Sequence, residues 1–283
     1  MPPAPIADRQ LQHLIDAALA GARVVMAIYG TDFSVARKID DSPVSEADLG
    51  SEEAIGEALA VTLPGIPVVA EEGVSRGTSP KIGRFFLLVD PLDGTKEFIS
   101  RNGEFTVNVA LIEDASPVSG VVLAPALGLA YAGSRKGAWR GTIAADLAGI
   151  ADWRPIKVRR SGAHPVAVAS RSHMNPATAD ALHQAACGEH RSIGSSLKFG
   201  LLAEGEADFY PRLGPTMEWD TAAGDAVLRA AGGAVVALDG DPLPYGKESA
   251  PKMRPFENPF FIAVGDPALL ERLDLAALRA KAA

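Results

Sequence analysis

The apolar run at residues 85–89 constrains the fold most, because it offers no polar face to solvent. A strand that is apolar on both faces belongs in the middle of a sheet covered by further layers. Other short apolar runs, bounded by Gly, Pro and polar residues, predict strands at 66–70, 106–112, 120–123, 129–132 and 138–141. The first half of the chain is therefore predicted to be strand-rich and layered.

Helical periodicity and turn signals organise the rest of the chain. They predict helices at 7–29 and 45–63, where Ser45 and Asp48 have capping-box spacing, and a mobile surface loop at 72–84. The second half alternates predicted strands with predicted helices: strands at 166–169, 234–238 and 260–264, and helices at 176–186, from 194, at 219–232 and from Asp266-Pro267. We predict an α/β fold with an α+β N-terminal domain (1–150) and an α/β C-terminal domain (151–283).

Composition excludes several classes of protein. The net charge of −8 provides no global basic surface for a nucleic-acid polymer. No secretory signal is recognised, and no stretch reaches the roughly 18 apolar residues of a membrane helix. The single cysteine, Cys187, excludes an intrachain disulfide and is predicted to be an ordinary rather than a reactive thiol. We expect a cytoplasmic protein, with peripheral membrane contact left open.

Acidic residues cluster where the central strand is predicted to end. Asp90 and Asp93 flank a predicted turn, and a short helix at 96–100 follows. Mg²⁺ prefers carboxylate and carbonyl oxygens, and the Leu92 carbonyl and Glu71, at the end of a neighbouring predicted strand, add donors. An ordinary acidic turn explains an isolated pattern of this kind equally well.

Four stretches resemble, in order, motifs of the inositol monophosphatase superfamily. They are 44–48 (VSEAD), 71–73 (EEG), 90–95 (DPLDGT) and 219–224 (WDTAAG). Four further stretches resemble the bacterial 3′(2′),5′-bisphosphate nucleotidase branch: 96–98 (KEF), 170–173 (SRSH), 194–199 (GSSLKF) and 210–212 (YPR). The resemblance implies a layered α-β-α-β-α sandwich of the inositol monophosphatase and sugar phosphatase type.

The resemblance also implies roles for individual residues. It assigns two or three Mg²⁺ ions to Glu71, Asp90, Asp93, Asp220 and the Leu92 carbonyl. It makes Asp48, Thr95 and Glu71 catalytic, with Asp48 and Thr95 orienting the attacking water, and it places the Gly94 and Thr95 amides on the cleaved phosphate. It places the substrate against Asp220, the 5′-phosphate against Ser195 and Lys198, and the adenine between His173 and Arg212. Taken without the family, these residues also suit simpler roles: helix caps for Asp48, Thr95, Ser195 and Asp220, a solvated helix residue for Lys198 and an exposed loop residue for His173.

The function implied by this resemblance is Mg²⁺-dependent hydrolysis of 3′-phosphoadenosine 5′-phosphate to AMP and phosphate, which clears a by-product of sulfate activation. The partner is then a small bisphosphorylated nucleotide, the protein is a monomer or a homodimer, and Li⁺ inhibits by replacing one Mg²⁺. Two alternatives stay open. One is an inositol monophosphatase or fructose-1,6-bisphosphatase, and the other is a metal- and phosphate-binding regulator without turnover.

Overall fold

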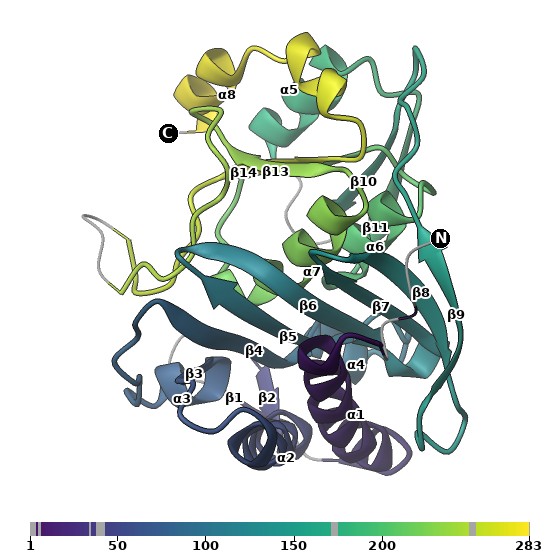
Figure 1. Cartoon of the computed structure of the whole chain (residues 1–283). Helices are drawn as coiled ribbons and strands as arrows, with labels where there is room; N and C mark the ends of the chain where they lie inside the picture. The colour runs from purple at the N-terminus through teal and green to yellow at the C-terminus, as the bar shows by residue number, and fades with distance from the viewer. Residues whose placement is uncertain are drawn as a thin grey trace.

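The computed structural model describes residues 4, 7–33, 35–37, 43–170, 175–248 and 253–282. These residues form two sheets and three helical layers, stacked α-β-α-β-α (Figure 1). Helices α1 (Arg9–Tyr29) and α2 (Glu46–Thr62) cover the first sheet, α6 (Leu197–Ala203) and α7 (Glu218–Ala230) lie between the sheets, and α5 (Pro176–Gln184) and α8 (Leu275–Ala282) cover the second. The predicted fold class is confirmed.

The first sheet has seven strands in the order β3-β4-β5-β6-β7-β8-β9. Their bounds are Val68–Ala70, Phe85–Asp93, Thr106–Glu113, Ser116–Ala124, Leu129–Ser134, Gly137–Ile143 and Ile150–Ile156. Only β3 and β4 are parallel, and the other neighbours are antiparallel. Strand β9 was not predicted, because a partly exposed edge strand with charged residues lacks the apolar pattern. It carries the sheet past residue 150, and the division into two domains stays a prediction.

The second sheet has five strands in the order β11-β10-β12-β14-β13. Their bounds in chain order are β10 Val166–Ser170, β11 Glu189–Ile193, β12 Phe209–Arg212, β13 Ala234–Ala237 and β14 Phe261–Val264. Strand β11 is another polar edge strand and escaped prediction for the same reason. A two-stranded pair, β1 (Val35–Arg37) with β2 (Pro43–Ser45), precedes α2.

Short helices correct two predictions. The segment predicted as a loop at 72–84 begins inside helix α3 (Glu71–Ser75), because two acidic residues in a first turn favour a helix start. The helix predicted from Asp266-Pro267 is a 3₁₀ helix, η3 (Pro267–Arg272), and α8 follows it separately. The remaining short helices are α4 (Thr95–Ile99) and η2 (Pro125–Leu127).

Helix α1 corrects the prediction that no segment is long and apolar enough to cross a membrane. Among the described residues, it is the one helix that meets that test of length and composition. Half of its most apolar window is buried inside the fold, where Leu11, Leu14 and Val25 pack in the core beneath the first sheet. A helix at the core of a globular fold meets the same test, and its amphipathic stripe is the one that the sequence predicted.

Helix α7 packs unusually close to the first sheet, and this fixes where its N-terminus lies. A Cβ added to Gly120 on β6 would stand 2.5 Å from the Ala223 carbonyl oxygen, and one added to Gly133 on β7 would stand 2.5 Å from the Val227 Cα. Small residues on both sides of this contact therefore let the helix backbone rest on the strands. The start of α7, which carries Asp220, is held over the same sheet as β4.

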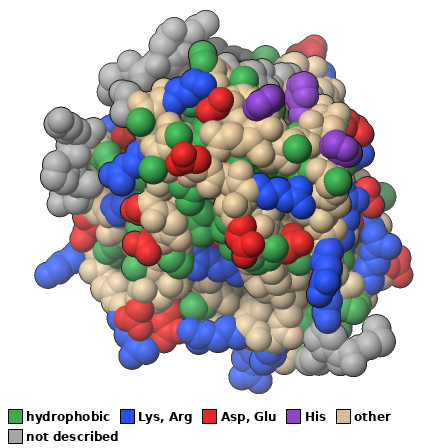
Figure 2. All heavy atoms as spheres, turned by 90° about the horizontal axis from the view of Figure 1, so that it is seen from above, with side chains coloured by type: hydrophobic (Ala, Val, Ile, Leu, Met, Phe, Trp, Pro, Cys, Tyr) green, Lys and Arg blue, Asp and Glu red, His purple; other side chains and the backbone are tan. Residues whose placement is uncertain are grey.

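Surface charges are interspersed on the face covered by α5 and α8. Figure 2 shows Lys and Arg side chains alternating with Asp and Glu side chains there, with no continuous basic band. A face with interspersed charges of both signs offers no basic surface of the kind that a nucleic-acid polymer requires, and the predicted absence of such a partner stays a prediction.

Candidate metal and phosphate site

A β-bulge presents the acidic pair Asp90 and Asp93. Asp90 pairs with Asn108 and Asp93 with Thr106, so two residues of β4 oppose one residue of β5 between these pairs. Pro91, which has no N–H to donate, occupies the bulge. In a regular strand, residues three apart point to opposite faces, and the extra residue turns both carboxylates towards the same side. The predicted turn is therefore wrong in form, because the chain stays in β4 and bulges.

Glu71 lies beside this bulge. Strands β3 and β4 run parallel with Ala70 opposite Val89, so Glu71 and Asp90 are the next residues at the same end of adjacent strands. Glu71 is also the first residue of α3. Glu71 thus follows the end of β3 beside Asp90, as the sequence predicted, but Asp90 does not end its strand, because β4 continues to Asp93.

Asp220 on α7 completes the acidic cluster, although it lies more than a hundred residues after Asp90 and Asp93 in the sequence. It makes a side-chain hydrogen bond with Asp90, and its Oδ2 accepts from the Met217 N–H at 2.8 Å. Burial, followed by the nearby negative charge of Asp93, raises the pKa of Asp220 to about 6. A buried carboxylate that is repelled by a second one is stabilised by a cation bound between them.

Asp48 and Thr95 meet on the other side of the bulge. One oxygen of Asp48, Oδ2, accepts from the backbone N–H and the hydroxyl of Ser45 at 2.7 and 2.8 Å, which confirms the predicted capping box. The other oxygen, Oδ1, lies 3.4 Å from the Thr95 hydroxyl. That hydroxyl lies at the same distance from the Leu92 carbonyl oxygen. Asp48 thus caps α2 and faces Thr95 at the same time.

Two residues that the sequence prediction did not assign hold Asp93. The Ser196 hydroxyl lies 2.6 Å from Asp93 Oδ2 and also contacts the backbone carbonyl of Asp220, and the Asn108 amide donates to Ser196 at 3.0 Å. Both are almost fully buried. Ser196 therefore links the bulge to the start of α7. A polar Asn inside the apolar stretch 106–112 was the available signal for Asn108.

Because Ser196 holds the predicted metal ligand Asp93, we expect Ser196→Ala to lower kcat/KM for the reaction that the resemblance implies by roughly ten- to a hundredfold. Ser134→Ala is the matched control. It removes another buried serine hydroxyl, which lies at the end of β7 and donates to Asp8, the residue before α1. Steady-state kinetics of both variants test this, and equal effects would show a general cost of losing a buried hydroxyl.

Two cations border the acidic cluster. Lys198 is 4% exposed, and its ammonium donates to the carbonyls of Ile193 and Ser195. Burial lowers the pKa of Lys198 to about 8, while the negative charge of Asp93 opposes that shift. Arg212 is also buried and donates to the Pro215 carbonyl, while its Nε has no partner among the described residues. The simpler reading of Lys198 as a solvated helix residue is wrong.

The remaining predicted contacts sit at the junction of the two halves. Gly94, at a φ of +91°, has its Cβ position 3.3 Å from the Ser195 Cβ, so the chain between β4 and α4 touches the residues just before α6. Ser195 itself has a φ of +47°, a conformation that non-glycine residues rarely adopt. His173 lies outside the described residues.

Cys187 is partly buried, and burial raises its pKa to about 11, which agrees with an ordinary thiol.

The donor set suits a hard divalent cation. It consists of carboxylate and carbonyl oxygens, and the buried Asn108 Oδ1 beside Asp93 accepts no hydrogen bond within the described part of the chain. In that same part, no three His, Cys, Asp or Glu side chains are gathered closely enough to hold a metal ion as they stand. The predicted ligands Glu71, Asp90, Asp93 and Asp220 come from neighbouring elements without yet forming a closed ligand set, and the metal assignment stays a prediction.

Comparison with known proteins defines the class. The family model of the inositol monophosphatase family matches residues 7–256. The chain belongs to this family. Within it, the chain is 43% identical over 255 residues to the 3′(2′),5′-bisphosphate nucleotidase CysQ of Salmonella typhimurium, covering 89% of this chain and 98% of that protein. CysQ of Escherichia coli K12 is also 43% identical, over 86% of this chain and 94% of its own length.

Solved structures agree with that relationship. The crystal structure of CysQ from Bacteroides thetaiotaomicron, a bacterial member of the same family, has a TM-score of 0.74 at 39% identity, covering 90% of this chain and 97% of that one. The inositol monophosphatase from Anabaena has a TM-score of 0.71 at 23% identity, covering 97% and 96%, and shares the fold.

Proposed function

We propose that this protein is a Mg²⁺-dependent 3′(2′),5′-bisphosphate nucleotidase that hydrolyses 3′-phosphoadenosine 5′-phosphate to AMP and phosphate. The supporting observation is that Asp220 on α7 lies beside Asp90 and Asp93 on β4, more than a hundred residues earlier, with two buried cations next to them. The identity to nucleotidases over most of both chains points to the same substrate. Disposal of a by-product of sulfate activation in the cytoplasm follows from that substrate.

Each part of the site has a proposed task in the hydrolysis. When bound by Glu71, Asp90, Asp93, Asp220 and the Leu92 carbonyl, Mg²⁺ would lower the pKa of a water molecule and neutralise phosphate charge. Asp48 Oδ1 and the Thr95 hydroxyl orient the attacking water between them. The water oxygen forms a bond to phosphorus and the bond from phosphorus to the 3′-oxygen breaks. One proton of the water stays on the released phosphate, and the other is made up on the 3′-oxygen, which leaves as the hydroxyl of AMP. The Gly94 and Thr95 amides hold the phosphate that is cleaved.

The substrate's other end meets the second half of the chain. Beside the larger effect of burial, the positive charge of Arg212 acts to lower the pKa of both Lys198 and Asp220, so Arg212 lies close enough to each of them to interact electrostatically. We propose that Lys198 and Ser195 hold the 5′-phosphate, and that Arg212 and His173 flank the adenine. A buried ammonium next to a carboxylate cluster favours a ligand that carries a second anionic group.

We predict that Lys198→Met raises KM for the adenosine bisphosphate roughly ten- to a hundredfold, the cost of losing one hydrogen bond to a charged group. The effect on inositol 1-phosphate, which has no second phosphate, should be much smaller. Lys157→Met, at an exposed position, is the control. Equal losses on both substrates would remove Lys198 from substrate selection.

A substrate panel tests the proposed function. Phosphate release is measured from 3′-phosphoadenosine 5′-phosphate, inositol 1-phosphate and fructose 1,6-bisphosphate, each with Mg²⁺ and with a chelator. We expect the highest kcat/KM on the nucleotide and no release with the chelator. A preference for either sugar phosphate would instead support the phosphatase alternative, and no release from any substrate at saturating Mg²⁺ would support a regulator.

A further inference from the structure

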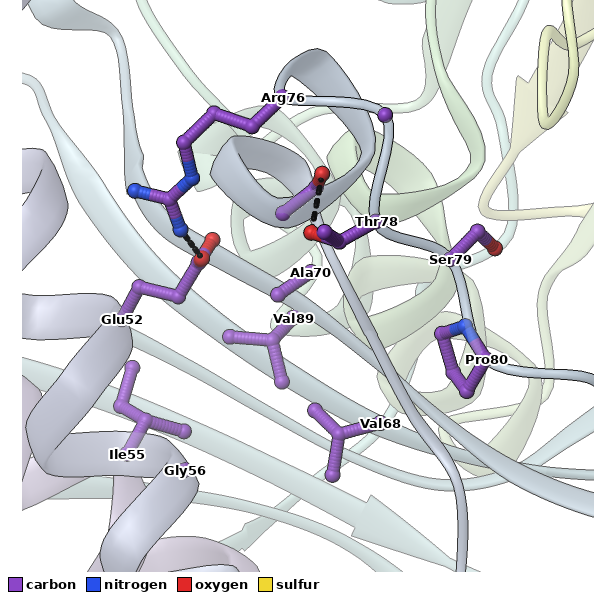
Figure 3. A pocket seen from close by; sticks show the side chains of 12 residues that line it. Glu52, Ile55, Gly56, Val68, Ala70, Arg76, Thr78, Ser79, Pro80 and Val89 are labelled. Carbon is purple, nitrogen blue, oxygen red and sulfur yellow. Dashed lines mark hydrogen bonds and ion pairs between the residues drawn. The ribbon is translucent and has the colours of Figure 1, made fainter.

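An open cavity of about 610 Å³ lies between α2 and α3, next to the proposed metal ligand Glu71. Val68 and Val89 lie along it, and Figure 3 shows Arg76, the residue that follows α3, reaching towards Glu52 on α2. The Arg76 Nη2 atom lies 3.0 Å from Glu52 Oε1. This ion pair is one of two links that Glu52 makes to α3.

The second link is to the backbone at the start of α3. Glu52 Oε2 accepts from the Glu72 N–H at 2.7 Å, and Glu52 also bonds with the Gly73 backbone. The first N–H groups of a helix have no acceptor within it, and Ala70, at the N-cap, supplies no side-chain cap. Glu52 therefore caps α3 from a different helix, twenty residues earlier in the chain.

The position of Glu52 on α2 connects this cap to the rest of the site. Asp48 and Glu52 are four residues apart, so they lie on the same side of α2, one turn from each other. Asp48 faces Thr95 beside the bulge, while Glu52 holds the helix that begins with Glu71. One rigid helix thus sets the spacing between the proposed water-orienting residue and a proposed metal ligand.

A stabilising role alone explains this arrangement poorly. The Arg76 side chain is 57% exposed, and an exposed ion pair contributes about 0 to 1 kcal/mol. The Glu52 side chain is only 13% exposed, so its carboxylate is partly desolvated, which carries a cost. Glu52 is bonded both to the Glu72 N–H at the start of α3 and to Arg76 at its end. The clearest consequence of these two bonds is that they fix the orientation of α3.

We propose that Glu52 is a positioning residue that holds Glu71 in place for metal binding. Arg76 in turn fixes the orientation of the Glu52 carboxylate. This proposal rests on the proposed function, in which Glu71 binds a divalent cation. Positioning through a neighbouring group typically contributes ten- to a hundredfold to metal affinity.

Calorimetric titration of the substrate-free protein with Mn²⁺ tests the proposal. Glu52→Ala should weaken Mn²⁺ binding about ten- to a hundredfold, Arg76→Ala should weaken it less, and Glu52→Gln, which keeps an oxygen for the Glu72 N–H, should recover most of the affinity. Glu53→Ala is the matched control, because Glu53 is an exposed glutamate on the same helix. In kinetics, Glu52→Ala should raise the Mg²⁺ concentration at half-maximal rate, while kcat at saturating Mg²⁺ stays near the wild-type value.

Wild-type Mn²⁺ affinity in Glu52→Ala, or an equal loss in Glu53→Ala, would overturn the positioning role. If Glu52→Ala does not fold, Glu52→Gln and Arg76→Ala provide the test instead. Unchanged Mn²⁺ affinity in Arg76→Ala together with a full loss of affinity in Glu52→Gln would also contradict the positioning role. If the wild-type protein itself binds no Mn²⁺, the proposed function fails instead, so the two failures are distinguishable.

Discussion

Asp90→Asn should lower kcat/KM by about a thousandfold or more while the fold survives. The substitution keeps the size of the side chain and an oxygen that can accept from the Leu92 N–H, which donates to Asp90 Oδ1 at 3.1 Å. It removes the negative charge at the centre of the bulge. Metal ions contribute several kcal/mol to charge stabilisation in such reactions, and each 1.36 kcal/mol is a factor of ten in rate. Steady-state kinetics and circular dichroism measure the two halves of this prediction.

Asp114→Asn serves as the surface control. Asp114 lies in the turn after β5, at the opposite end of β4 from the bulge, and its side chain is 68% exposed. Its substitution should leave kcat/KM unchanged. Near-wild-type turnover in Asp90→Asn would contradict the ligand role of Asp90, and loss of the circular dichroism signal would assign the residue to folding instead.

The sequence predicted which residues form the site better than it predicted how they are arranged. Asp90, Asp93 and Glu71 follow apolar runs, and that pattern was sufficient to place them at one end of a sheet. The bulge at Pro91 could not be predicted, because it depends on the register with β5, which is a property of two strands. For the same reason, the link from Ser196 to Asp93 spans residues whose proximity no local pattern expresses.

Prediction of the fold failed mainly at sheet edges and at short helices. Central strands such as β4 and β5 are buried on both faces, so their apolar runs are unambiguous. Strand β11 has four exposed polar residues and forms through backbone pairing with β10. Helix α3 has only five residues and receives its cap from Glu52 on α2, so its stability depends on tertiary contacts that the local sequence does not contain.

Asp220→Asn should have opposite effects on stability and activity. In the metal-free fold, burial and then the charge of Asp93 raise the pKa of Asp220 from 3.8 to about 6. The folded state therefore holds this proton more tightly than the unfolded state does. Below pH 4 the carboxyl is protonated in both states, and nothing is lost. As the pH rises from 4 to 6, the unfolded chain releases the proton first, so the stability of the folded state falls, and the full cost is present above pH 6.

Replacement by Asn removes that cost, because the amide carries no charge and can donate to Asp90. A pKa difference of about two units corresponds to 2 to 3 kcal/mol. Denaturant unfolding of chelator-treated protein should therefore show Asp220→Asn more stable than the wild type by about that amount at pH 7, with little difference at pH 4. Asp239→Asn, on the surface, should show no such gain.

Added Mg²⁺ should reverse that order. A ligand that binds only the folded state stabilises it in proportion to its affinity, so the wild type gains stability and Asp220→Asn gains much less. The same substitution should lower kcat/KM by about a thousandfold, since it removes a proposed ligand. If metal-free Asp220→Asn were less stable than the wild type at pH 7, the carboxylate would serve the fold through its bond to Met217. Its repulsion with Asp93 would then be too weak to mark a cation site.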